Sequence, residues 1–184
     1  MKQPSASDHA IRLLGRGDAA VFRDMRLRAL KEAPEAFGAS HEDTLKEPLS
    51  YFEDWLTARP VFMAFEMGLD GETPAGMVAM IRDPGAKMEH RGRLISMYVA
   101  PEARGTGLAA RLVETVIAHA LEVGVTQMHL VVAVHNDTAR RFYERMGFQT
   151  YATEPRALRV GGRYIDEYAM VRFFDEAPKD EDNE

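Results

Sequence analysis

The feature that most constrains the fold is a helical stripe between two strand-like segments in the middle of the chain. Residues 107–123 place apolar side chains on one helical face, and Gly124 follows as a stop signal. Residues 94–99 precede the stripe, and residues 125–134 follow it as an almost continuous apolar run. Such a run is typical of a strand that is covered on both faces. This order of elements favours a mixed sheet with helices packed on it.

Signals on either side of this centre extend the pattern. Helices are predicted at residues 19–32, after the capping residue Asp18, at residues 49–58, and from Asn136 or Asp137 to Met146. Further strands are predicted at residues 10–14, 61–67, 75–81, 148–153 and 164–173. Hairpin-like turns near residues 68–71 and 83–85 favour antiparallel neighbours. We therefore expect an α/β fold with a single twisted mixed sheet of about six to seven strands and helices on both faces.

Length and composition narrow the organisation. The chain has 184 residues, which suits one domain, expected here at residues 9–174. Residues 1–8 read as a flexible N-terminal arm, and residues 175–184 as a disordered acidic tail. There is no cysteine, so disulfides, thiolate metal sites and a cysteine nucleophile are excluded.

Charge and hydropathy argue against several partners. The net charge of −6 and the lack of a Lys/Arg run speak against nucleic acid. No apolar run approaches the ~18 residues of a membrane span, and the start lacks a signal peptide, so a cytoplasmic location is expected. His119, His129 and His135 have no metal-ligand spacing, so no metal is expected.

A glycine-rich loop opens the long helix. Gly105 and Gly107 let an anion approach the free N–H groups of a helix N-terminus, and Arg104 adds a positive charge. These features predict a cradle for a diphosphate. A helix start with glycines that merely turn the chain fits the loop alone equally well.

The same loop also matches the dinucleotide fingerprint G-x-G-x-x-A at residues 105–110. That fingerprint follows its strand almost directly, whereas residues 100–104 intervene here. The next strand ends in Ala133-Val134-His135, without an acidic residue for a ribose. A nucleotide-dependent oxidoreductase is therefore disfavoured.

Two motifs in the right order carry a family resemblance. Arg104, Gly107 and Ala109 meet the pattern Q/R-x-x-G-x-G/A. Roughly 30 residues later, a second signature, N-x-x-A-x-x-F-Y-x-x-x-G-F, is met by Asn136, Ala139, Phe142, Tyr143, Gly147 and Phe148. Residues 94–148 thus resemble the GNAT superfamily of acyl-CoA-dependent N-acyltransferases. The order of elements extends the resemblance over residues 9–174.

The resemblance implies that acetyl-CoA is the acyl donor, without a metal. It implies cofactor contacts from Met97, Tyr98, Val99, Arg104, Gly105, Thr106, Gly107, Leu108, Ala109, Asn136, Ala139 and Tyr143. Backbone groups of Met97 and Val99 would pair with the pantetheine arm between diverging strands, although both also fit as ordinary strand residues. A backbone N–H near Val99 would stabilise the oxyanion, a contact worth ~3 kcal/mol in other enzymes.

Three further residues have two interpretations each. Asn136 fits a hydrogen bond to the cofactor arm and also a helix cap. Arg140 and Arg141 fit the 3′-phosphate of CoA and also a solvated helix face.

Tyr143 is implied as the catalytic residue, a general acid for the leaving thiolate; a packed core ring is the alternative. Full proton transfer from a phenol to a thiolate is uphill by about 2 kcal/mol with unperturbed pKa values, so a hydrogen bond to the thiolate is easier to defend.

The implied reaction is direct attack of a primary amine on the thioester in a ternary complex. Some relatives carry a glutamate near the start of the strand at residues 94–99, where this chain has Arg93. The general base is therefore open, with Glu66, Glu89 and His90 as candidates.

The acceptor is open as well: a primary amine of a small molecule or of a protein. Phe37, Trp55 and Tyr164 are candidates for lining its site, and each also fits the core. The chain is expected to be a monomer or a homodimer. A non-catalytic acyl-CoA-binding sensor module is the alternative to an enzyme.

Overall fold

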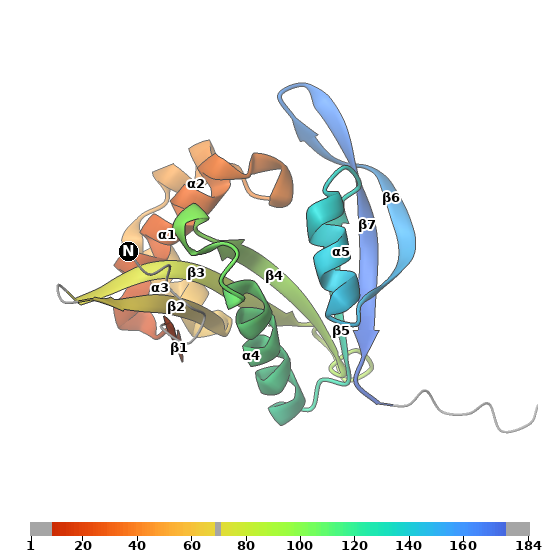
Figure 1. The fold of residues 1–184 in the computed structure, drawn as a ribbon, viewed down its shortest axis with the longest axis horizontal. Coiled ribbons are helices and arrows are strands. Elements are labelled where there is room, and N and C mark those ends of the chain that lie inside the picture. Colours follow the sequence, from red (N-terminus) through yellow and green to blue (C-terminus); the bar gives the residue numbers. More distant parts are fainter. Residues whose placement is uncertain (1–8, 69–70, 176–184) are drawn as a thin grey trace, which may run out of the picture.

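The sheet that the sequence predicts has seven strands in the computed structural model, which describes residues 9–68 and 71–175 (Figure 1). The strands lie in the order β1-β2-β3-β4-β5-β7-β6. The predicted α/β fold, with one mixed sheet and helices on both faces, is confirmed. The strands are β1 (His9–Leu13), β2 (Val61–Gly68), β3 (Gly71–Arg82), β4 (Arg91–Val99), β5 (Gln127–Ala133), β6 (Gln149–Val160) and β7 (Arg163–Phe173).

Five α-helices are seen in the described part of the chain: α1 (Ala19–Glu32), α2 (His41–Lys46), α3 (Leu49–Ala58), α4 (Leu108–Glu122) and α5 (Asp137–Arg145). Short 3₁₀ turns add η2 (Arg16–Asp18), η3 (Pro34–Ala36) and η4 (Pro101–Ala103). The bounds of α1 and α3 are those predicted. No helix within the described ranges has the length and apolar content to cross a membrane. The predicted arm at residues 1–8 and nearly all of the predicted tail at residues 175–184 lie outside the described residues.

Strand pairing changes character in the middle of the sheet. Strands β1 to β4 pair antiparallel with their neighbours in chain order. Strands β4 and β5 are parallel and are joined by α4. Strand β7 then pairs antiparallel with both β5 and β6. The parallel pair is thus the seam between two antiparallel halves.

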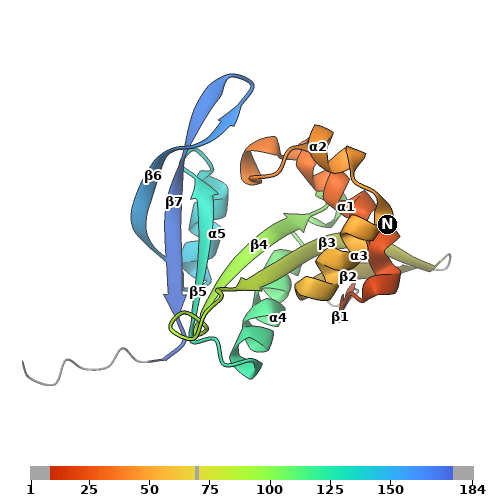
Figure 2. The same cartoon turned by 180° about the vertical axis from the view of Figure 1, so that it is seen from behind.

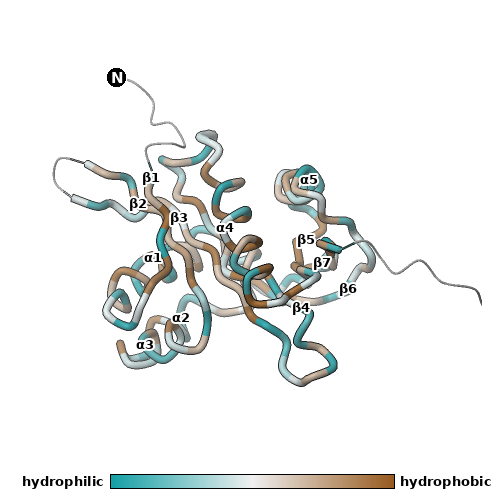
Figure 3. Tube along the Cα trace, turned by 90° about the horizontal axis from the view of Figure 1, so that it is seen from below, coloured by the Kyte–Doolittle hydropathy of each residue, from teal (hydrophilic) through white to brown (hydrophobic). Residues whose placement is uncertain are grey.

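Two buried clusters form the layers. Helices α1 and α3 pack on one face of β2, β3 and β4, around Phe22, Phe52 and Met77. Helix α4 packs on the opposite face around Leu112, and the same cluster continues under α5 to Tyr143 and Phe148. Figures 1 and 2, seen from opposite sides, show α4 and α3 on opposite faces of the central strands. Figure 3 shows apolar residues concentrated along these strands and α4, while α5 is largely hydrophilic.

The prediction that residues 125–134 form a strand covered on both faces is wrong. Burial alternates along β5: Met128 and Leu130 are buried, whereas Val131 is 54% exposed. Helices α4 and α5 cover one face of this strand. In the described part of the chain, the other face carries no α-helix (Figure 2), although the short turn η3 contacts β5. Apolar residues on that open face made the run look continuous.

Two local predictions also need correction. Asp18 stands at the N-cap of α1, but its side chain does not cap the helix. Its carboxylate instead pairs with Arg12 at 2.9 Å and accepts the Gly15 N–H at 2.8 Å. Strand β6 runs well beyond the predicted end at residue 153, because pairing with β7 resumes at Leu158 after a bulge.

Candidate active site

The seam between the two halves opens into a split. Strands β4 and β5 pair only where Arg91–Arg93 lie beside Gln127–His129. Beyond this point β4 pairs only with β3, and β5 only with β7. The facing edges of residues 94–99 and 130–133 therefore carry backbone groups without a strand partner in the described structure. Such edges bind extended ligands by adding backbone hydrogen bonds.

A bulge marks β4 next to the split. The register with β3 shifts between Met77 and Ala79, and Ser96 takes a φ of 56°. A left-handed conformation in a residue with a Cβ costs roughly 1–2 kcal/mol, so the surroundings must hold it. Arg26 of α1 does so by donating from Nη1 to Ser96 Oγ at 2.8 Å. Helix α1 thus fixes the shape of β4 at the split.

The backbone direction of β4 is set beyond the bulge. The Ala100 N–H donates to Ala75 O of β3 at 2.9 Å. Because directions alternate along a strand, the groups of Val99 point to the split, and those of Met97 point the same way. The backbone groups of Tyr98 point the other way, toward β3. Its ring is buried against α1, and its hydroxyl donates to Glu32 Oε2 at 2.6 Å. Tyr98 is therefore not retained among the proposed cofactor contacts.

The predicted phosphate loop follows directly. Gly105 and Gly107 have φ values of 76° and 88°, a conformation that favours glycine. Thr106 Oγ1 accepts the Leu108 N–H at 3.3 Å and donates to Ala103 O at 2.8 Å.

No acceptor is seen in the described structure for a set of N–H groups at this helix start, which comprises Gly105, Thr106, Gly107, Ala109 and Ala110. Converging N–H groups at a helix N-terminus form an anion site. The Leu108 side chain itself is buried in the core.

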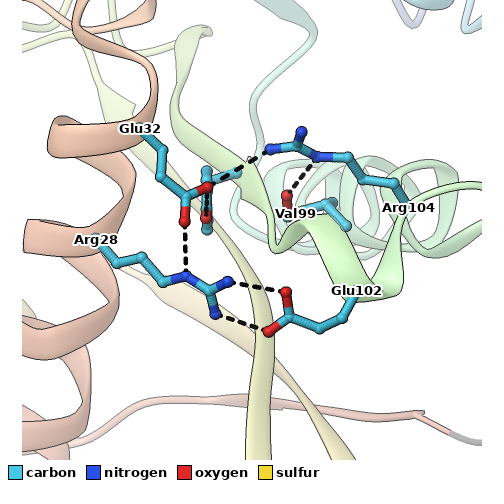
Figure 4. Close-up of polar contacts among 6 residues, drawn as sticks. Arg28, Glu32, Val99, Glu102 and Arg104 are labelled. Atoms are coloured by element: carbon cyan, nitrogen blue, oxygen red, sulfur yellow. Dashed lines mark hydrogen bonds and ion pairs between the residues drawn. The ribbon is translucent and has the colours of Figure 1, made fainter.

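Arg104 turns away from these N–H groups. Its Nε donates to Val99 O at 3.0 Å, and its Nη2 lies 3.9 Å from Glu32 Oε2 (Figure 4). Its side chain is 57% exposed, so the guanidinium is held loosely. Arg104 therefore lies at the head of the split, within the same cluster as the end of β4.

An ion-pair network ties this region to α1 (Figure 4). Arg28 donates to Glu32 at 2.9 Å and grips Glu102 of η4 through two bonds of 2.7 and 2.8 Å. Hydrogen bonds from Tyr98 and Arg28 lower the pKa of Glu32. Burial and the bond to Glu32 raise the pKa of Tyr98 to about 12. Sequence reasoning missed this network, because its contacts from α1 to Tyr98 and Glu102 join residues 66 and 74 positions apart.

Helix α5 follows β5 on the far side of the split. Asn136 Oδ1 accepts the Ala139 N–H at 3.0 Å, so the capping interpretation of Asn136 is met, with its amide N–H groups left for other partners. Tyr143 is 7% exposed, and its ring packs against Phe142 and Phe148. Its hydroxyl makes no hydrogen bond to the described residues. Burial raises the pKa of Tyr143, which weakens it as a full proton donor.

A cleft of about 340 Å³ lies between the end of α1 and the end of β5. On the β4 side it is lined by the end of α1 and by η3, from Glu32 to Ala36. On the β5 side it is lined by Ala133, His135 and Asn136. The cleft therefore adjoins the end of β5, and Glu32 connects it to Tyr98 of β4.

Comparison with known proteins decides the family. The model of the acetyltransferase (GNAT) family matches residues 26–148. The chain belongs to this family. An uncharacterised N-acetyltransferase of Mycobacterium tuberculosis is 35% identical over 97 residues, 53% of this chain and 58% of that protein. The mycothiol acetyltransferase of Actinosynnema mirum is 30% identical over 141 residues, 76% of this chain and 43% of that protein. The chain thus spans about half the length of these curated relatives, 58% of the first and 43% of the second.

Solved structures share the GNAT fold. An acetyltransferase of the family from Streptococcus pneumoniae aligns with a TM-score of 0.78 and 23% identity, over 90% of this chain and 99% of that one. A Salmonella typhimurium protein, provisionally assigned as an acetyltransferase and solved with acetyl-CoA, aligns with a TM-score of 0.73 and 21% identity. That match covers 94% of this chain and 97% of that one. At such identities, the likeness concerns the fold.

The expected general-base candidates lie away from the GNAT split. Glu66 is on β2, opposite His9 of β1. Glu89 and His90 lie in the turn before β4, at the end where β4 and β5 are still paired. Nine residues of strand separate His90 from Val99, roughly 30 Å. None of the three borders the cleft, so all three are set aside.

The expected acceptor lining is also placed differently. Phe37 and Trp55 lie 5.3 and 6.0 Å from the Arg26 guanidinium, and Tyr164 is exposed beside Arg156 at the β6–β7 hairpin. None of the three aromatic residues lines the cleft. An acidic residue that pairs with the cleft residue Ala133, Glu167 of β7, was missed. One signal was present: Glu167 is in phase with the apolar Ile165, Ala169 and Val171 along its strand.

Proposed function

We propose that the chain is an N-acetyltransferase that moves an acetyl group from acetyl-CoA to a primary amine by direct attack in a ternary complex. The observation that carries this proposal is the set of N–H groups without acceptors in the described structure, from Gly105 to Ala110, at the head of the β4–β5 split. An anion site alone fits many ligands. Together with an open strand edge leading away from it, the site fits a diphosphate joined to an amide-bearing arm.

Successive residues along the split could bind successive parts of CoA, from the pyrophosphate to the pantetheine arm. The loop N–H groups would hold the pyrophosphate, and Arg104 would turn from Val99 O toward it, since Arg104 is largely exposed. The backbone of Val99 and Met97 would pair with the pantetheine amides as a strand does. Asn136 would support the arm from the β5 side while it caps α5. Acetyl-CoA supplies the activated acyl group.

Tyr143 would then act by hydrogen bonding. Its hydroxyl has no partner among the described residues, and its pKa is raised by burial. A hydrogen bond to a developing thiolate stabilises the charge without requiring the phenol to lose its proton. The relatives named as N-acetyltransferases and the fold neighbour solved with acetyl-CoA support the choice of donor.

Calorimetry with acetyl-CoA tests the donor site. Gly107→Glu puts a carboxylate where the diphosphate would lie, and we expect acetyl-CoA affinity to fall roughly 100-fold or more, about 3 kcal/mol. Gly85→Glu is the matched control, because Gly85 also has a positive φ, 96°, and nothing lies within 4 Å of an added Cβ. Equal affinity in both variants, with both folded, would refute the assignment of the loop.

Release of free CoA separates an enzyme from a sensor. The wild-type protein is incubated with acetyl-CoA and a panel of amines: amino acids, polyamines, aminoglycosides and peptide N-termini. We expect amine-dependent release of CoA with at least one class. Tight acetyl-CoA binding without turnover across the panel would favour the non-catalytic acyl-CoA-binding module.

A further inference from the structure

The half of the sheet formed by β5, β7 and β6 has one face that no described α-helix covers, although the 3₁₀ turn η3 contacts β5 and β6. Helix α5 lies on the other face, as Figures 1 and 2 show from opposite sides. On the face without an α-helix, Ala133 of β5 pairs with Glu167 of β7, which in turn pairs with Glu154 of β6. Paired residues in a sheet point to the same face, so these three side chains form a row. The row begins at the cleft, because Ala133 lines it.

Glu167 is the unusual member of this row. It is only 9% exposed, yet within the described structure no hydrogen-bond donor or cation contacts its carboxylate. Burial raises its pKa, and the nearby charge of Glu154 raises it further. A buried acid without a partner costs stability, and acids with raised pKa values are common at functional sites.

The other carboxylates at the cleft are engaged. Glu32 accepts from Tyr98 and Arg28, and these bonds lower its pKa. Glu35 lies 2.8 Å from His135 Nε2 and 3.0 Å from Arg163 Nη2. The lowered pKa makes Glu32 a poor proton acceptor, and the Glu35 carboxylate is occupied by its two partners. Glu167 alone among the three combines a place beside the cleft with a free carboxylate.

We propose that Glu167 receives the proton that the acceptor ammonium loses before its nitrogen attacks the thioester, directly or through one water, and that its charge selects cationic alkylamines. This inference rests on the proposed acetyl transfer. It deepens that proposal by naming the proton acceptor and the class of acceptor.

The proposed reaction moves one proton of the ammonium to Glu167 and another to the sulfur of CoA. One ammonium N–H bond breaks, and an O–H bond forms on Glu167, which later releases this proton to water. The nitrogen lone pair forms the C–N bond to the acetyl carbonyl carbon, and the C–S bond breaks with its electrons on sulfur. The second amine proton ends on that sulfur, so CoA leaves as the thiol while Tyr143 hydrogen-bonds to it.

The raised pKa of Glu167 favours transfer of a proton to its carboxylate. The pKa of an alkylammonium lies roughly six units above that of an ordinary glutamic acid, and a raised pKa narrows the difference. Among the described residues, the cross-strand neighbours of Glu167 are Glu154 on β6 and the apolar Ala133 on β5. Glu35 of η3 and His135 lie at the cleft, and they are paired with each other.

The test compares Glu167→Gln with Glu114→Gln, an exposed acid on α4 that serves as the control. For the best alkylamine of the panel, we expect Glu167→Gln to lower kcat at least 100-fold, in the range of general-base catalysis, with acetyl-CoA affinity unchanged. In Glu167→Gln, the fall of kcat/KM toward low pH should disappear. Glu154→Gln, which removes a repelling charge, should move that fall to lower pH.

A second acceptor separates a base from a merely structural residue. O-Alkylhydroxylamines are neutral at pH 7 and need no initial deprotonation, so their turnover should fall less than tenfold in Glu167→Gln. An equal loss with both acceptors, or an unchanged pH profile, overturns the role of Glu167 and leaves acetyl transfer intact. A carboxyl NMR titration adds a readout without turnover: a Glu167 signal that titrates in the ordinary glutamate range also overturns it. A wild-type protein that binds acetyl-CoA but acetylates no amine refutes both proposals.

Discussion

The two halves of the sheet, joined only by the short β4–β5 pairing, are built differently. Strands β2 and β3 carry runs of consecutive buried residues, because α1 and α3 cover one face and α4 the other. Strand β6, at the far edge, has no buried residue along its length. The first half is a closed three-layer core, and the second is a two-layer unit with one open face.

The two halves therefore differ in what they hold near the split. The closed half fixes the phosphate loop and the β4 edge, since Arg26, Arg28 and Tyr98 tie both to α1 and the core. The open half places Ala133 in the lining of the cleft and Glu167 beside Ala133 on the neighbouring strand. In the proposed function, the acyl donor would be held by the closed half, and the amine acceptor would enter and leave along the open half.

The largest contrast is expected from truncating one apolar residue in each half. Leu112 of α4 is fully buried in the closed half, so Leu112→Ala should lower the free energy of unfolding by about 3–5 kcal/mol. Val131 is 54% exposed on the open face, so Val131→Ala should change it by less than about 0.5 kcal/mol. Chemical denaturation of both variants measures the contrast, and equal losses would contradict it.

The two tyrosines give the next contrast. Tyr143 on the open half has a hydroxyl without a described partner, so Tyr143→Phe should lower kcat roughly 10- to 100-fold and leave acetyl-CoA affinity unchanged. Tyr98 on the closed half donates to Glu32, so Tyr98→Phe should instead cost about 1–3 kcal/mol of stability. Steady-state kinetics and thermal unfolding of both variants test this. Unchanged turnover in Tyr143→Phe would remove Tyr143 from the mechanism.

Much of the closed half could be predicted from the sequence, because local signals dominate there. The bounds of α1 and α3 follow from apolar periodicity and from Pro34, and the loop at residues 104–109 from its glycines. The Arg28–Glu102 pair joins segments 74 residues apart, and no local pattern announces such a contact.

The open half was harder to predict. The burial of β5 was misjudged because apolar residues such as Val131 also occur on an exposed face. The strand split depends on where pairing stops, which is a property of the whole sheet. In the sequence, Glu167 stands out only because it occupies the same face of its strand as apolar residues. The predicted bases were near β4, so this position was not among them.

Glycine positions test how tightly the closed half is packed. An added Cβ on Gly76 of β3 would lie 2.9 Å from Tyr98 O and 3.1 Å from Leu112 Cδ1. Because the carbonyl belongs to the backbone of β4, Gly76→Ala should cost about 1–3 kcal/mol and disturb the strand edge. Gly38→Ala has nothing within 4 Å and should be nearly neutral. Thermal unfolding of Gly76→Ala and Gly38→Ala checks this. If Gly76→Ala did not lower stability, the backbone of β4 could shift at little cost to make room for the added Cβ.

The smallest effect concerns the stability cost of the open half. The folded protein raises the pKa of Glu167 above that of the unfolded chain, so its contribution to stability is fully present below the ordinary glutamate pKa and is lost as pH rises through the raised value. Glutamine has no such loss. Glu167→Gln should therefore match the wild type in acid and exceed it at pH 7 by less than about 1 kcal/mol, or about 2–4 °C in Tm.

Thermal unfolding between pH 4 and pH 8 measures this difference, with Glu114→Gln as the reference. A gap between Glu167→Gln and the wild type that is constant with pH would mean that the side chain matters only through packing. A gap that opens with rising pH, in a variant that has also lost turnover, would mean that the open half gives up stability to keep a carboxylate ready to accept a proton.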